Sequence, residues 1–169
     1  MLYYVPLLLI LTVNLWHGVK WNMTLLETVL YILTMFGVGV LEEIIFRGLL
    51  FNALLKDNVK TAIIVSSLTF GMGHIINLIN GSGAELVPNL LQVVYASAAG
   101  FMFVMIYYRT KSLLVCIATH GLFNALSAFA NEINSTLQSQ IVSCVLLVLI
   151  SGGYAIYIAL QIRKDYAIN

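Results

Sequence analysis

Long stretches of apolar residues are the feature of this sequence that most restricts its fold. A run of about 20 apolar residues, which as a helix crosses roughly 30 Å of hydrocarbon, is typical of a membrane-spanning helix. Six such segments can be placed, near residues 2–19, 25–55, 61–79, 87–108, 112–131 and 138–161. The sequence therefore predicts an all-α fold, a polytopic membrane helix bundle of about six transmembrane helices, with residues 1–169 as a single membrane domain.

The composition excludes most other classes of protein. Hydrophobic residues make up 61% of the chain and charged residues 9%, whereas a soluble protein has about 25% charged residues, so little polar surface is available to face water. The formal net charge of +1 leaves no basic face for a nucleic acid. Cys116 and Cys144 both lie inside apolar runs, so neither a disulfide framework nor a thiolate metal site is expected.

Two of the apolar segments need a closer description. The segment at 2–19 has no Lys or Arg before its apolar stretch and no small-residue cleavage site, so we interpret it as a retained helix and not as a signal peptide. The segment at 25–55 would be about 46 Å long as one helix. We therefore expect it to tilt strongly, to break near Gly37 and Gly39, or to end in the membrane interface.

The charged loops predict the orientation of the bundle. Six crossings would place the following cations on one face: Lys56, Lys60, Arg109, Lys111, Arg163 and Lys164. The opposite face would carry Lys20, Glu85 and Glu132. Because cytoplasmic loops carry an excess of Lys and Arg, both termini of this multi-pass protein are expected in the cytoplasm.

Ionisable residues inside an apolar segment cost about 2.5–3.5 kcal/mol each and therefore indicate functional sites. The segment at 25–55 contains Glu42, Glu43 and Arg47. Glu43 and Arg47 are four residues apart, so they share a helical face and can neutralise each other. Glu42 is rotated about 100° from Glu43 and needs another partner. The alternative is that both acids serve only to fix helix packing.

Two further segments contribute histidines. His74 follows two glycines, which would let another helix approach closely, and His120 lies one turn before Asn124 on the same helical face. Taken alone, each histidine could be a packing residue. Counted from the cytoplasmic ends, however, Glu42 and His74 lie about 20 Å deep, Asn124 about 18 Å and His120 about 12 Å. Three helices thus bring rare polar groups to similar depths.

Three motifs in this order, EExxxR at residues 42–47, FxxxH at 70–74 and HxxxN at 120–124, resemble the CPBP family of membrane endopeptidases. These are the CAAX proteases and bacteriocin-processing enzymes, also called the Abi family. The resemblance covers a protease core over residues 40–126. It implies an intramembrane peptidase in which Glu42 and His74 activate water and His120 and Asn124 stabilise the oxyanion. Glu43 and Arg47 would support the site structurally.

The expected cofactor is none, with zinc as the alternative. The sequence has no HExxH pair on one helix, and Asn124 is a poor zinc ligand but a good oxyanion donor. A metal-dependent version of the reaction would use Glu42, His74 and His120 as ligands.

The resemblance implies a membrane-associated peptide or a lipidated protein as substrate, cleaved near the cytoplasmic leaflet of the lipid bilayer. For so small a chain we expect a bacterial plasma-membrane protein that acts in bacteriocin or pheromone maturation or in self-immunity, with CAAX-type processing as another possibility. The alternative function is a non-catalytic bacteriocin-immunity or membrane scaffolding protein. A transporter or proton relay is a third, although the sequence lacks the repeated halves typical of transporters.

Overall fold

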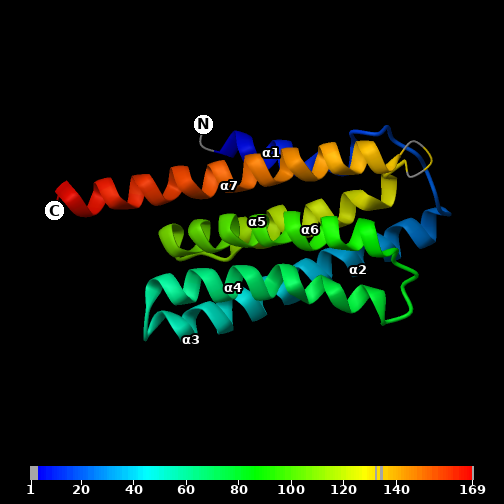
Figure 1. Ribbon diagram of the computed structural model, residues 1–169. Coiled ribbons are helices and arrows are strands. Elements are labelled where there is room, and N and C mark those ends of the chain that lie inside the picture. The colour runs from blue at the N-terminus through cyan, green and yellow to red at the C-terminus, as the bar shows by residue number, and fades with distance from the viewer. Residues whose placement is uncertain (1–3, 132, 134, 169) are drawn as a thin grey trace.

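The protein is a bundle of helices in the computed structural model, which describes residues 4–131, 133 and 135–168 (Figure 1). The α-helices of this part of the chain are α1 (Val5–Leu11), α2 (Leu25–Glu43), α3 (Asn52–Leu55), α4 (Val59–Gly73), α5 (Leu86–Thr110), α6 (Leu114–Leu126) and α7 (Leu137–Ile168). Four apolar helical segments within it are long enough to cross a membrane: Leu25–Leu55, Val59–Leu78, Leu86–Thr110 and Leu137–Asp165. The predicted all-α membrane bundle is confirmed.

Two of the six predicted segments are shorter than a full crossing. The segment predicted at 2–19 contains only α1 and a 3₁₀ turn at Val13–Leu15, after which Gly18 turns the chain with a φ of 102°. The segment at 112–131 forms the apolar helix Leu114–Phe129, which is about 24 Å long. Among the described residues, four of the six predicted segments are thus long helices and two are shorter.

The segment at 25–55 does not break at its glycines but changes helix type further along the chain. A capping box between Thr24 and Glu27 starts α2, which continues as α-helix through Gly37 and Gly39. The change comes after Glu43, where residues Ile44–Phe51 form a π-helix that leads into α3. π-helical turns are rare and are frequently found at functional sites. Here the π-helix starts directly after the two acidic residues of the first motif.

Small residues let the helices that carry the motifs approach closely. A Cβ atom at Gly39 would lie 2.8 Å from the backbone of Gly121 on α6. Between α4 and α5, a Cβ at Gly71 would overlap Ser97, and a Cβ at Gly100 would lie 2.7 Å from the α4 backbone. Glycine at these positions therefore sets the spacing of α2 against α6 and of α4 against α5.

The two ends of the bundle differ in charge. The α3–α4 turn, the α5–α6 turn and the end of α7 lie together at one end, and the α4–α5 and α6–α7 connections lie at the other (Figure 1). At the first end, which carries the six cations, Arg109 pairs with Asp165 at 3.3 Å and joins α5 to α7. This grouping agrees with the topology predicted from the loops. Of the residues assigned to the opposite face, Glu132 lies outside the described residues.

Replacing Gly39 by alanine is expected to destabilise the protein, because the new methyl group would meet the α6 backbone, which cannot move aside as a flexible side chain can. The expected loss is about 1–3 kcal/mol of unfolding free energy. The measurement is thermal or denaturant unfolding of the purified protein in detergent.

The matched control for this prediction is Gly37→Ala on the same helix, where the added Cβ has no atom within 4 Å. This variant should unfold at or slightly above the wild-type temperature, because alanine favours the helix. Equal effects of the two substitutions would contradict the packing role assigned to Gly39.

Candidate active site

A chain of buried polar groups lies at the centre of the bundle, at the start of the π-helix. Arg47 Nη1 lies 2.9 Å from Glu43 Oε1, and the side chains of both residues are fully buried. The same carboxylate oxygen lies 2.9 Å from His120 Nδ1 on α6. Because an ionised carboxylate can only accept, Nδ1 is assigned as the protonated nitrogen of the ring. Glu43 thus neutralises Arg47 and fixes the orientation of His120.

Arg47 is surrounded by groups that suit a buried cation. Its Nη2 donates to the Gly100 carbonyl of α5 at 3.2 Å. Its guanidinium carbon lies 4.3 Å from the centre of the Phe70 ring and 5.2 Å from that of Phe103. Aromatic faces attract a cation most strongly where water is excluded. Glu43 and Arg47 thus form the ion pair that their spacing along one helix predicts.

Two phenylalanines align the histidine rings. The Phe70 ring makes edge contacts with His74 and His120, at centroid distances of 5.6 and 5.4 Å. Phe103 stacks on His120 at 5.5 Å with an angle of 22° between the rings. Phe70 was predicted only as a member of its motif, and Phe103 was not predicted as a site residue. An aromatic residue in an apolar helix carries no local signal that separates this role from ordinary packing.

Glu42 contacts His120. Its Oε2 atom lies 3.3 Å from His120 Nε2, without the angles of a hydrogen bond, and its side chain is 27% exposed. Among the described residues no hydrogen bond or ion pair joins Glu42 to His74. The two residues predicted to activate water together are therefore not joined to each other by a hydrogen bond or an ion pair. Instead, His120 lies between the two acidic residues of the first motif.

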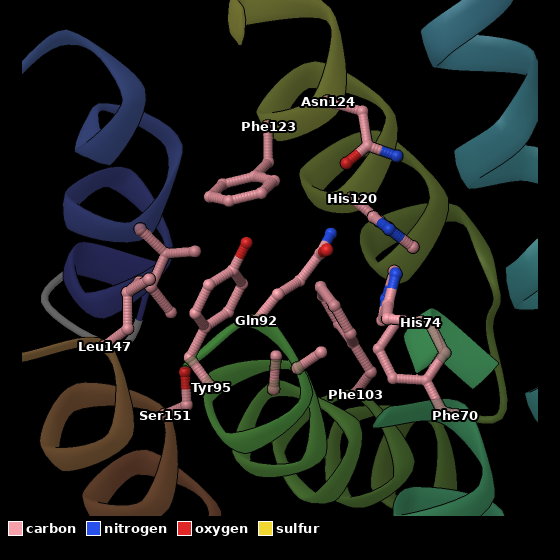
Figure 2. Close-up of a pocket in the computed structure, with 13 residues that line it drawn as sticks. Phe70, His74, Gln92, Tyr95, Phe103, His120, Phe123, Asn124, Leu147 and Ser151 are labelled. Carbon is pink, nitrogen blue, oxygen red and sulfur yellow. The ribbon is translucent and has the colours of Figure 1, made fainter. Parts of the chain in front are cut away.

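A small cavity, which we call the inner pocket, brings the two histidines and the asparagine together. His74, His120 and Asn124 all line it, among mostly apolar neighbours (Figure 2). Its volume is about 50 Å³, which is enough to hold water. The structure thus gathers the residues of the second and third motifs at one site, and Glu42 reaches that site through its contact with His120.

A second and larger cavity, which we call the vestibule, adjoins the inner pocket. Its volume is about 790 Å³, and it shares four lining residues with the inner pocket: Gln92, Tyr95, Phe123 and Leu147. The vestibule is also lined by residues 82–85 of the α4–α5 connection and by Ala130, Asn131 and Ser135 before α7. It therefore opens at the end of the bundle opposite the six cations, whereas the reaction was predicted near the cationic, cytoplasmic end.

Two amide side chains on α5 also belong to the site. Asn89, which is 2% exposed, donates through Nδ2 to the His74 carbonyl at 2.9 Å, where α4 passes into a 3₁₀ helix. Gln92 lies one turn further along and lines both cavities. Neither residue was predicted, because neither is ionisable and neither belongs to one of the three motifs. The signal that could have identified them is the presence of uncharged amide side chains inside the predicted apolar segment at 87–108.

A zinc ion at this site would need three converging donor side chains. In the described part of the chain no group of three His, Cys, Asp or Glu side chains converges in a way that could hold a metal ion. Zinc needs at least three protein ligands at about 2.0–2.3 Å around one point. Glu42, His74 and His120 do not fit this requirement as they are placed.

Comparison with known proteins identifies relatives among membrane proteases. Residues 24–126 match the family described as type II CAAX prenyl endopeptidase Rce1-like. The chain is also 36% identical over 86 residues to a protein of Bacillus subtilis (strain 168) named "Putative membrane peptidase YdiL". This match covers 50% of the chain and spans 30% of the length of the relative. No solved structure matches the chain.

The buried ion pair predicts a large effect of removing one partner. Arg47→Met should lower the unfolding free energy by about 3–5 kcal/mol, because Glu43 is left buried without its cation. The double variant Glu43→Gln with Arg47→Met should recover part of this loss, since it removes both charges. Unfolding of the purified variants in detergent measures both effects.

The control for these variants is Arg109→Met, which breaks the more exposed pair with Asp165. It should change the unfolding free energy by less than about 1 kcal/mol, because solvent screens such pairs. A loss at Arg47 no larger than the loss at Arg109 would mean that the buried pair does not hold the bundle together.

Proposed function

This chain belongs to the Rce1-like family of type II CAAX prenyl endopeptidases, and we propose that it is an intramembrane endopeptidase that hydrolyses a peptide bond in a membrane-associated substrate. The observation that carries the proposal is the position of His120. Glu43 fixes its Nδ1 atom, so its Nε2 atom faces Glu42 beside a pocket that His74 and Asn124 also line. Acid–base groups and hydrogen-bond donors therefore meet at one small site.

In the proposed reaction Glu42 is the general base. It removes a proton from water, and the water oxygen attacks the scissile carbonyl carbon. The Asn124 amide donates a hydrogen bond to the oxygen that becomes negatively charged, which lowers the energy of the tetrahedral intermediate. His120 donates a second one through Nε2 as an imidazolium, in which both ring nitrogens carry a proton and Nδ1–H stays bonded to Glu43. His74 helps to orient the water, and the proton taken up by Glu42 is returned to the leaving amine. No step requires a metal ion.

The substrates in this proposal are peptides that reach the vestibule from the bilayer or its surface. Peptides matured as bacteriocins or pheromones, targets of self-immunity and lipidated CAAX proteins all meet this description. We place the protein in the plasma membrane of a bacterium, with both termini in the cytoplasm, because the cationic turns lie together at one end of the bundle. The vestibule then opens on the side away from the cytoplasm.

This orientation predicts different accessibility of two exposed positions. A cysteine at Glu85, before α5, should react with a membrane-impermeant maleimide on intact cells, whereas a cysteine at Lys60, in the first turn of α4, should react only after permeabilisation. The native Cys116 and Cys144 are buried, so labelling of the unsubstituted protein gives the background signal. If only the Lys60→Cys protein were labelled on intact cells, the predicted orientation would be wrong and the opposite orientation would be indicated.

Replacing Glu42 by glutamine should abolish proteolysis and leave the protein folded. Glutamine keeps the shape of the side chain but cannot accept a proton, and loss of a general base lowers kcat by about 10²–10⁴-fold. The measurement compares peptide termini in membranes and medium from cells that express wild type or Glu42→Gln at matched abundance. Termini that appear only with the wild type are expected, and they would identify the substrate.

The control for this experiment is Asp57→Asn, which makes the equivalent change from acid to amide at an exposed position outside both cavities. It should give the wild-type set of termini. If Glu42→Gln also gave that set, Glu42 would not be the base. A wild-type phenotype such as bacteriocin resistance that persists in Glu42→Gln, with no change in termini, would favour a non-catalytic immunity or scaffolding protein. Cleavage that a chelator stops and zinc restores would overturn the metal-free reaction.

A further inference from the structure

Gln92 occupies the boundary between the vestibule and the inner pocket. It is one of the four residues that line both cavities. In Figure 2 its amide group points into the inner pocket, toward the side where His74, His120 and Asn124 lie. A substrate that passes from the vestibule to the histidines therefore meets this amide.

Hydrogen bonds fix which end of the Gln92 amide faces the pocket. Its Oε1 atom accepts from Asn77 Nδ2 at 3.2 Å and from Asn89 Nδ2 at 3.4 Å. Both partners are donors, so this end of the amide is the oxygen and the other end is the NH₂ group. The Nε2 atom makes no hydrogen bond within the described residues. Gln92 therefore presents a donor whose orientation is already set.

The chemical partner of such a donor follows from its surroundings. Tyr95, Phe123 and Leu147 complete the boundary between the two cavities, and none of them carries a charge. A neutral amide donor in a mostly apolar passage suits a neutral acceptor. The backbone carbonyl of a peptide is one that every peptide substrate provides, whatever its side chains.

We infer that Gln92 is a substrate-binding residue, whose Nε2 group donates a hydrogen bond to a backbone carbonyl of an extended peptide beside the scissile bond. The inference rests on the proposed peptidase function. Asn77 and Asn89 act as positioning residues, because they hold Oε1 and thereby aim Nε2. Asn89 also bonds the His74 carbonyl, so one side chain fixes both the substrate donor and the backbone of a catalytic histidine.

The test measures KM and kcat of the purified full-length chain in detergent with a short fluorogenic peptide of alternating alanine and leucine. Gln92→Glu keeps the acceptor for Asn77 and Asn89 but removes the donor. Gln92→Met removes both the acceptor and the donor of the amide without adding a charge. Each variant should raise KM about tenfold, the effect of one lost hydrogen bond, and should change kcat less than about twofold because the bond forms equally in substrate and transition state. Gln138→Glu, an exposed glutamine outside both cavities, is the control.

Binding of the same peptide to the Glu42→Gln variant, followed by fluorescence anisotropy, separates failure of this inference from failure of the proposed function. Cleavage by the wild type with an unchanged KM in both Gln92 variants would overturn the inference alone. Binding that weakens about tenfold in both Gln92 variants, without cleavage by the wild type, would support Gln92 and overturn the peptidase. If the peptide were neither bound nor cleaved, both would be overturned.

Discussion

A guanidinium group at the centre of an apolar bundle costs several kcal/mol unless it is paired and hydrogen-bonded. Arg47 meets this requirement with partners from several helices: Glu43 in the same segment, the Gly100 carbonyl and the Phe103 ring on α5, and the Phe70 ring on α4. Glu43 extends the set to His120 on α6. Since each partner must be in place for the charge to be tolerated, this one ion determines where α2, α4, α5 and α6 meet.

Close packing and the site depend on the same residues. Gly39 touches Gly121, and these two glycines lie next to the polar groups: Glu43 is one turn after Gly39, and His120 directly precedes Gly121. The short distance between α2 and α6 is therefore what allows His120 to reach both acidic side chains. On the other side, the contact of Gly100 with the α4 backbone brings a carbonyl of α5 within reach of Arg47.

What could be predicted from the sequence was mostly local. The pairing of Glu43 with Arg47 follows from their spacing along one helix, and the apolar segments predicted the fold class and most helix positions. The π-helix could not be predicted because the usual pattern assumes 3.6 residues per turn. The contact of Glu42 with His120 depends on how two distant helices are rotated, which no spacing within either helix encodes. The length of α1 was overestimated because an apolar run does not show where a helix ends.

The difference in size between the two cavities restricts the shape of a substrate in the proposed reaction. An α-helix with its side chains is about 10–12 Å across, so the inner pocket of about 50 Å³ cannot admit a helical turn, whereas the vestibule of about 790 Å³ can hold a longer piece of chain. A helical membrane peptide would therefore have to unwind around the bond that is cut. The local helix stability of the substrate would then contribute to selection, in addition to its sequence.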